Sequence, residues 1–431
     1  MNCISSPQRL GLAPESNGLP RISHRVAGVR KESTEHTYQL AEGKNRAWAT
    51  LKIYSLAKSP KSLPTFIERE PINATLEIHA EKGDSIHQIT ATVTGRIITG
   101  ANSTDAFTFL SETLPVWSKS PESSGIPSPS QGVSANKLAG HCVWPISMTL
   151  PKAVNVPGVD GEACFYRLPE TFLERHTKVS VQYDLSLVIC RGKLRTSNII
   201  KTAFGFVPHT RPEVPSFLRQ LAYREGTPLP GPSCDPDGWK TLQPVVVHGM
   251  LKARQVEVRC SLSLAKPLSY ARGSVLPCYM TLEGHDNDAL DAFSMPTSIV
   301  VHLRRRVKYY QANSSARQGV AWNESFENMG SAIWWPVHNS QDDHYTRHME
   351  GEIRLAKDLR PTSAMGHYSL SYSVALCPFD LAFGSSEKAP LISEPVEITT
   401  LYAKGPRPIA YSPPAYEQPL RRTSELYIAP F

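Results

Sequence analysis

Apolar and polar residues alternate with a period of two along much of this chain. The segment KVSVQYDLSLVIC shows the pattern clearly, with one apolar side made of Val179, Val181, Tyr183, Leu185, Leu187 and Ile189. The segments VEVRCSLSL, TSIVVHLRRRVKYY and HYSLSYSVAL repeat it. Such alternation predicts strands with one buried and one solvated face. It favours antiparallel sheets packed as sandwiches, because strands of a doubly covered parallel sheet are apolar on both sides.

The alternating segments form two sets, which predict two tandem immunoglobulin-like β-sandwiches and an all-β fold class. The segment between them holds seven prolines from Val207 to Gly238, which favours an extended linker. Both ends of the chain lack a strand pattern and are expected to be disordered. The predicted organisation is an extension over 1–45, a sandwich over 46–207, a linker over 208–244, a sandwich over 245–400 and a tail over 401–431.

Few segments have helical periodicity. Short helices are expected around 216–223 and 352–359. A loop of functional length is expected over about 311–349, and it contains Trp322, Trp334 and Trp335. Exposed tryptophans there would suit a contact with cargo or membrane, whereas burial between the sandwiches is the simpler interpretation.

Composition narrows the class of protein. The 431 residues are 40% hydrophobic and 20% charged, which is ordinary for globular proteins, whereas 36 prolines are many. The net charge of +7 slightly favours acidic partners. The sequence lacks the dense basic stripe that is typical of a nucleic-acid binder. The eight cysteines form no CxxC pair and are expected to be reduced, mostly buried thiols. Because the sequence shows no signal peptide and no long apolar run, we expect a cytosolic protein. Its four N-x-S/T sequons are then expected to be chance matches rather than glycosylation sites.

Four segments and a tail motif together resemble the α-arrestin family, also called arrestin-related trafficking adaptors. The segments are PINATLEIHAEKGDSIHQITATVTG, LAGHCVWPISMTLP, LPETFLERHTKVSVQYDLSLVI and EVRCSLSLAKPLSYARGSVLPCYMTLEG. The resemblance implies the arrestin fold of two β-sandwiches and an adaptor function. The chain departs from the family in its long N-terminal segment and its single PPxY motif. A phosphate-activated switch is not carried over, since the charged core of visual arrestins has no match.

The PPxY motif is Pro413, Pro414, Ala415 and Tyr416. Consecutive prolines hold the backbone in the extended polyproline II form, so little entropy is lost on binding. WW domains bind such segments in aromatic-lined grooves. In a WW complex Pro413 and Pro414 would stack in the groove and Tyr416 would enter a neighbouring pocket. The simpler interpretation is a proline-rich tail with an accidental tyrosine.

Two kinds of regulatory or contact site are also predicted. Ser424 follows two arginines and suits a basophilic kinase, and Ser120 and Ser128 precede prolines; a phosphate would add about −2 charge. A basic face is formed by alternation along one strand, with Arg304, Arg306 and Lys308 on the same side. That face suits anionic lipid head groups or an acidic cytosolic segment. An ordinary solvated surface is the alternative for each.

Enzyme motifs are missing from the sequence. The segment Gly132–Asn136 lacks the second glycine of a nucleophile elbow, and no phosphate-binding GxxxxGK[ST] loop occurs. Asp342, Asp343, His344 and His348 form an acidic-histidine cluster, in which His344 and His348 would share one face of a helix and a metal is conceivable. The flanking segments show no helical apolar pattern, which favours a polar loop instead. We therefore expect no enzymatic activity, no cofactor and no metal site.

The sequence thus predicts an adaptor that links membrane-protein cargo to a WW-domain, HECT-type ubiquitin ligase. Its partners would be those WW domains, cytosolic segments of plasma-membrane transporters or receptors, and an anionic membrane surface. The protein would be cytoplasmic and recruited to the plasma membrane and endosomes. The alternative is an arrestin-fold sorting scaffold whose PPxY motif is incidental. A third possibility, an unrecognised hydrolase, would need a pocket of converging titratable groups.

Overall fold

Strands dominate the computed structural model. It describes residues 33–42, 46–80, 86–100, 106–119, 138, 140–192, 196–251, 254–311, 321–337, 344–379 and 389–416. Strands account for 58% of the structure, against a usual share of about 20–25%, so the predicted all-β class is confirmed. Within the described residues there are two α-helices, α1 (Phe217–Glu225) and α2 (Asn287–Phe293), and two short 3-10 turns, η2 (Pro236–Gly238) and η3 (Pro414–Tyr416).

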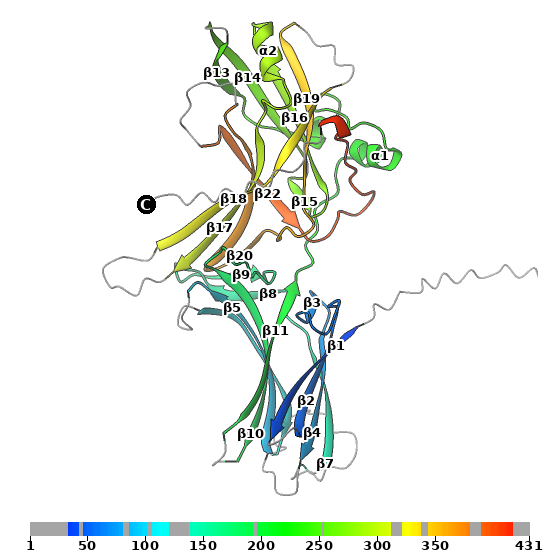
Figure 1. The fold of residues 1–431 in the computed structure, drawn as a ribbon, viewed down its shortest axis with the longest axis vertical. Helices are drawn as coiled ribbons and strands as arrows, with labels where there is room; N and C mark the ends of the chain where they lie inside the picture. The colour runs from blue at the N-terminus through cyan, green and yellow to red at the C-terminus, as the bar shows by residue number, and fades with distance from the viewer. Residues whose placement is uncertain are drawn as a thin grey trace, which may run out of the picture. The chain divides into compact units, whose positions relative to one another are not determined.

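The first β region, residues 34–207, contains two sheets that lie face to face in Figure 1. The four-stranded sheet has the order β1 (Thr34–Glu42), β2 (Arg46–Ser55), β4 (Ile72–Ala80) and β7 (Gly140–Met148). The five-stranded sheet has the order β3 (Thr65–Ile67), β11 (Asn198–Val207), β10 (Ser180–Arg191), β5 (Ile86–Ile98) and β6 (Ala106–Ser118). A hairpin of β8 (Ala153–Pro157) and β9 (Ala163–Arg167) lies outside both sheets.

The core of this region follows the predicted alternation. Every second residue of β10 is buried, including Tyr183, whose hydroxyl donates a hydrogen bond to the Pro169 carbonyl. Its ring packs against Phe109, Phe204 and Phe206 at centroid distances of 5.3–5.6 Å. Buried aromatic rings contribute both apolar area and favourable edge contacts, so Tyr183 lies at the centre of an aromatic cluster.

The second β region, residues 239–399, is one long path of strands. Its strands run in the order β12 (Trp239–Thr241), β14 (Arg254–Ala265), β16 (Val275–Glu283), β19 (Thr346–Arg354), β18 (Ala321–Pro336), β17 (Val301–Gln311), β21 (Tyr368–Leu376), β22 (Ile392–Thr399) and β15 (Ser269–Ala271). Two more strands pair alongside, β13 (Val245–Leu251) with β14 and β20 (Ser363–Met365) with β21.

Two strand assignments correct the expected loops and boundaries. The first strand begins at Thr34, so the expected disorder over 1–45 does not hold for Thr34–Glu42. This strand was missed because it is an edge strand that buries only His36 fully, and its inward positions tolerate polar residues. The expected loop over 311–349 is largely strand, because β18 covers Ala321–Pro336 and β19 begins at Thr346.

The helix predictions had mixed outcomes. The helix expected over 216–223 is α1, which Ser216 caps by accepting a hydrogen bond from the Arg219 N–H. The helix expected over 352–359 is wrong, since Glu352 to Arg354 continue β19. Glu352 and Ile353 pair there with strands on both sides, and this tertiary pairing overrides any local helical preference.

The proline-rich linker is more structured than expected. Between 208 and 244 it contains α1, η2 and β12, and it buries Arg219, Tyr223 and Trp239. Prolines prevent regular pairing, yet their apolar rings can still pack on a sheet. In the rest of the article, the linker means residues 208–238.

Candidate functional site

The chain after β22 lies against the second β region and the linker, and we call residues 401–416 the docked segment. Its start is held by backbone bonding, with the Leu401 N–H donating to the Thr210 carbonyl at 2.9 Å. The Tyr402 hydroxyl donates to the Gly273 carbonyl at 3.0 Å. The disordered tail expected from residue 401 onward therefore needs correction over this segment.

Tyr411 and Ser412 bind the middle of the docked segment to β19 and α1. The Tyr411 N–H donates to Glu352 Oε2 at 2.8 Å, and Arg354 Nη2 donates to Ser412 Oγ at 2.8 Å. The Tyr411 ring stacks on Tyr223 of α1 with centroids 6.4 Å apart. Burial raises the pKa of the Tyr411 hydroxyl, and nearby Glu352 adds to this. The approach to the motif is thus anchored by backbone, side-chain and ring contacts.

The PPxY motif itself begins where these anchors end. Pro413 is half-buried, whereas Pro414, Ala415 and Tyr416 are exposed. The Tyr416 N–H donates to the Pro413 carbonyl at 3.0 Å and closes the η3 turn. The expected WW-binding residues are therefore adjacent and largely accessible. A WW groove takes an extended polyproline II segment, so this turn would have to open on binding.

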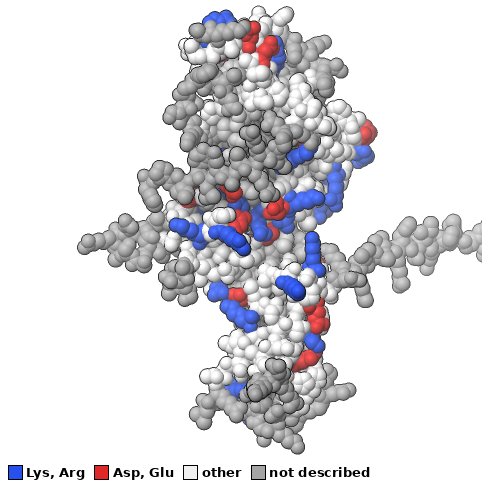
Figure 2. Space-filling view, in the orientation of Figure 1, with Lys and Arg blue, Asp and Glu red and all other residues white. Residues whose placement is uncertain are grey.

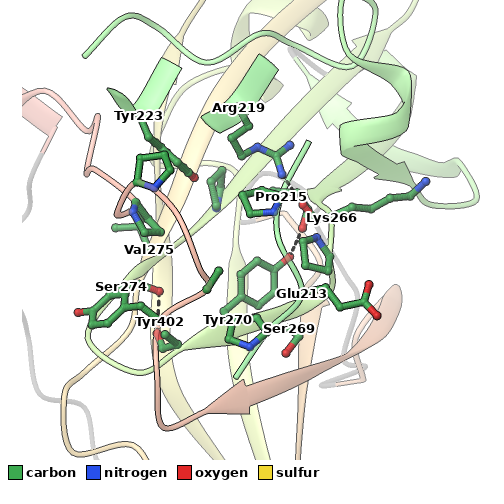
Figure 3. Close-up of a pocket in the computed structure, with 18 residues that line it drawn as sticks. Glu213, Pro215, Arg219, Tyr223, Lys266, Ser269, Tyr270, Ser274, Val275 and Tyr402 are labelled. Carbon is green, nitrogen blue, oxygen red and sulfur yellow. Dashed lines mark hydrogen bonds between the residues drawn. The ribbon is translucent and has the colours of Figure 1, made fainter. Parts of the chain in front are cut away.

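Prolines and tyrosines line a small cavity beneath the first half of the docked segment. Its volume is about 50 Å³, and Figure 3 shows Tyr223, Tyr270 and Tyr402 around it. Arg219 donates to the carbonyls of Lys266 and Gly238, and burial lowers the pKa of its guanidinium. These bonds are internal to the fold, so Arg219 holds α1 to the second β region.

The predicted basic face exists on β17, but each of its cations has a neighbour on β18. Arg306 and Lys308 both pair with Glu324, and Lys308 lies 4.6 Å from the centre of the Trp322 ring. Arg304 lies 5.2 Å from the centre of the Phe326 ring. Hydrogen bonding from Arg306 lowers the pKa of Glu324, which therefore stays charged. Part of the positive charge on β17 is therefore compensated by Glu324 of the neighbouring strand β18.

Charges of both signs mix on the visible surface. Figure 2 shows Lys and Arg interspersed with Asp and Glu rather than gathered into a field of one sign. Such a surface attracts an anionic membrane only weakly over distance. The anionic-surface role of Arg304, Arg306 and Lys308 stays a prediction.

Sequence reasoning missed Arg305, which points to the opposite side of β17. Its side chain is 6% exposed, and both terminal nitrogens donate to the Glu174 carboxylate at 2.7–2.8 Å. Burial works to lower the pKa of Arg305, but hydrogen bonding to Glu174 together with the negative charges of Glu174 and Glu327 outweighs it, and the pKa is raised. Glu170 forms similar pairs with Arg272 and Arg360. Alternation alone could have flagged Arg305 as an inward charge that needs a partner.

The predicted phosphorylation sites and the acidic-histidine cluster remain to be placed in the structure. Ser120, Ser128 and Ser424 lie outside the described residues. His344 and His348 lie in a turn and on β19 rather than on one helix. Within the described ranges no group of three His, Cys, Asp or Glu residues could hold a metal.

The expectation of mostly buried cysteines is too strong, because only Cys142, Cys260 and Cys278 of the seven described cysteines are buried. The seven described cysteines are free thiols, of which Cys164 and Cys234 are exposed. Burial raises the pKa of Cys260 to about 12, which makes this thiol inert at physiological pH.

Comparisons with known proteins give no family assignment. No family model matches the sequence, and no curated protein matches it. A separate finding concerns membranes: in the part of the chain that the structure describes, no helix has the length and apolarity needed to cross a bilayer.

Proposed function

We propose that this protein is an arrestin-like adaptor that uses its PPxY motif to recruit a WW-domain, HECT-type ubiquitin ligase. The proposed architecture is two tandem β-sandwiches, one in each β region. The facing sheets of the first region and the long strand path of the second are compatible with it. The α-arrestin resemblance of the sequence supplies the functional hypothesis.

The exposure of Pro414 and Tyr416 directly after an anchored segment carries this proposal. A WW ligand must be accessible while the rest of the protein holds something else. Here the anchors at Tyr411 and Ser412 fix where the motif leaves the second β region, and the motif residues beyond Pro413 face solvent. The motif is therefore offered at a defined place on the fold.

In this mechanism the chain performs no covalent chemistry. It binds the cytosolic segment of a transporter or receptor with its β regions and the ligase with its motif. Tethering of this kind gives an effective concentration on the order of millimolar, so cargo lysines near the ligase are modified faster. The basic face of Arg304, Arg306 and Lys308 would contact acidic cargo segments or anionic lipids at the plasma membrane and endosomes.

The test is a titration of purified HECT-ligase WW domains against the full chain and its Tyr416→Ala variant. We expect binding with a micromolar dissociation constant, as for a short preorganised ligand, and its loss in the variant. Tyr345→Ala is the matched control, because Tyr345 is another exposed tyrosine of the second β region. Equal binding by Tyr416→Ala, or no binding by the unmodified chain, overturns the ligase connection and leaves the sorting-scaffold alternative.

A further inference from the structure

Ser412 stands directly before Pro413 and the rest of the PPxY motif. Proline-directed protein kinases modify a serine that is followed by a proline in an extended chain. The residue before a proline is biased toward extended backbone, and here a second proline, Pro414, follows. The sequence around Ser412 is therefore of the kind that such a kinase accepts once this part of the chain is accessible.

In the docked segment the Ser412 side chain is not accessible. The residue is 8% exposed, and its Oγ accepts a hydrogen bond from Arg354 Nη2 at 2.8 Å. One residue earlier, the Tyr411 N–H donates to Glu352 Oε2 at 2.8 Å. A kinase must therefore bind a chain in which residues 411–416 have left the second β region.

Local contacts, and not a strand ladder, hold this end of the docked segment. In the described part of the chain, residues 401–416 belong to no strand. A second cavity of about 200 Å³ adjoins the segment, and Trp335, Tyr411 and Pro413 are among its lining residues. Packing around Pro413 is thus incomplete. Segments with few buried contacts open locally at a small part of the free energy of global unfolding, so the folded protein can exchange docked and released states.

The docked position disfavours a phosphorylated serine. A phosphate adds about −2 charge and three acceptor oxygens, and it is repelled by a neighbouring carboxylate in a buried place. Glu352, which bonds the residue next to Ser412, is 2% exposed. Arg354 does contact Ser412, but its Nε also lies 3.7 Å from Glu352 Oε1. The phosphate would have to share this arginine with Glu352, whereas in the released chain it is fully hydrated.

We propose that Ser412 is a phosphorylation site and that its modification holds the docked segment in the released state. In the released chain, Ser412 Oγ attacks the γ-phosphorus of a nucleoside triphosphate bound to a proline-directed kinase. The new Oγ–P bond replaces the bond between that phosphorus and the bridging oxygen of the β-phosphate. The nucleoside diphosphate leaves, and the hydroxyl proton passes to a base of the kinase.

The release itself does not depend on a ligase. Its consequence does, because freer access of WW domains to Pro413–Tyr416 rests on the function proposed above. Two of the experiments below therefore use no WW domain.

The first experiment measures the release. The full chain is prepared with a phosphate on Ser412 alone, by genetic-code expansion, and its amide hydrogen exchange is compared with that of the unmodified chain by mass spectrometry. We expect exchange over residues 409–416 to become at least roughly tenfold faster, with unchanged exchange over β10 of the first β region. Unchanged or slower exchange over 409–416 overturns the proposal, because Arg354 would then hold the phosphate in the docked position.

The second experiment asks whether Ser412 is an acceptor. A mitogen-activated protein kinase acts on the full chain, on its Arg354→Ala variant and on a synthetic peptide of residues 407–418, and mass spectrometry follows the phosphate on Ser412. We expect the peptide to react fastest and Arg354→Ala to react several-fold faster than the unmodified chain, because the variant lacks the bond to Ser412.

Arg259→Ala is the matched control for this rate, because it removes an exposed arginine of β14 and should leave the reaction of Ser412 unchanged. No phosphate on Ser412 of the peptide overturns the site. Equal rates for the peptide and the unmodified chain overturn the claim that docking shields Ser412.

The third experiment links the site to WW binding. WW domains are titrated against the full chain and the 407–418 peptide, each with and without the phosphate on Ser412. We expect the unmodified chain to bind several-fold more weakly than the unmodified peptide, and the two phosphorylated forms to bind equally. A difference that persists after phosphorylation overturns the regulatory role. Absence of WW binding by the unmodified peptide contradicts the ligase connection instead, and the exchange experiment still decides whether phosphorylation releases the segment.

Discussion

The two β regions cover their sheets in different ways. In the first region the two sheets lie against each other, so strands supply the core on both sides. In the second region β16, β18 and β19 also carry side chains on an outer face, and the linker and the docked segment cover part of it. Each sheet of the first region is thus covered by the strands of the other sheet. The covered part of the second region is instead overlaid by proline-rich coil and the helix α1.

This difference teaches how proline-rich sequence should be interpreted next to a sheet. Proline stops strand pairing but leaves an apolar ring that packs well on exposed aromatic side chains. The linker and the docked segment do this from both directions of the chain, and they meet where Tyr411 stacks on Tyr223. Within the described residues, neither the linker nor the docked segment contributes a residue to a strand ladder of the second β region.

The largest expected effect comes from removing Trp239 of β12, a buried ring against which the linker packs through Arg219. Trp239 is 5% exposed, lies 5.0 Å from the Arg219 guanidinium and meets Tyr279 edge to face. We expect Trp239→Ala to lower the free energy of unfolding by about 3–5 kcal/mol, as measured by urea denaturation. Trp322→Ala, at a tryptophan 41% exposed on β18, is the control and should cost under about 1 kcal/mol. Equal losses would show that the cover contributes little stability.

A second prediction compares the tight packing inside the two regions. A Cβ at Gly351 would lie 2.4 Å from Cε3 of the Trp334 ring, and a Cβ at Gly95 would lie 2.5 Å from the end of the Phe109 ring. Trp334 is 1% exposed, and the atoms met include Cδ2 in the body of its ring system, so Gly351→Ala should cost roughly 1–3 kcal/mol by overpacking. Gly95→Ala should cost less, because the tip of the Phe109 ring can shift.

Gly330→Ala on β18 provides the matched control for both glycine variants. Its added methyl group would meet ordinary contacts at 3.4 Å or more. Urea denaturation of the three variants should rank Gly351 first, Gly95 second and Gly330 last. A cost at Gly330 as large as at Gly351 would mean that general strand propensity, rather than ring contact, sets the effect.

The parts of the fold that were predictable are those where one strand face is buried. Alternation identified β10, β14, β17 and β21 because their inward residues must be apolar. The same rule failed at β18, whose Trp322, Glu324 and Phe326 alternate charge with aromatic groups on a half-covered surface. The alternation of apolar and polar residues arises because one face of a strand is buried. A strand whose two faces are both partly exposed therefore does not show this alternation.

The site was predictable only in part, for a related reason. The residues Pro413, Pro414 and Tyr416 are visible as a motif, and the common face of Arg304, Arg306 and Lys308 follows from alternation. The bonds from Glu352 and Arg354 to the docked segment join residues about sixty positions apart. Such contacts depend on tertiary placement, and no local pattern in either segment encodes them.

A pH prediction concerns the junction where the first β region meets the linker. Glu68 is 3% exposed, and its Oε2 accepts from Arg167 Nη2 at 2.6 Å and from the His209 N–H at 3.0 Å. Burial works to raise the pKa of this carboxyl, but hydrogen bonding from Arg167 and the His209 N–H, together with the positive charges of Arg167 and Lys152, outweighs it, and the pKa is lowered. Its stabilisation is therefore complete above the ordinary value of 4.5 and is lost as the pH falls through the lowered folded pKa.

Glu68→Gln tests this by removing the titrating group while keeping an oxygen for Arg167. We expect a loss of about 1 kcal/mol at pH 7 and a flatter fall of the thermal midpoint between pH 5 and pH 3, measured by calorimetry. Glu257→Gln, at an exposed carboxylate, should leave that slope unchanged. An unchanged acid slope in Glu68→Gln would contradict the lowered pKa.

The smallest effect should come from loosening the docked segment beside the PPxY motif. Arg354 Nη2 donates to Ser412 Oγ at 2.8 Å, one residue before Pro413. A WW domain must take Pro413 from the cavity wall and extend the η3 turn, so part of its binding free energy is spent on release. Arg354→Ala should reduce that cost by up to about 1 kcal/mol and tighten WW binding up to roughly fivefold.

Arg259→Ala, which removes an exposed arginine of β14 outside both cavities, should leave the affinity unchanged. Weaker WW binding in Arg354→Ala would mean that docking presents the motif to the ligase rather than restrains it.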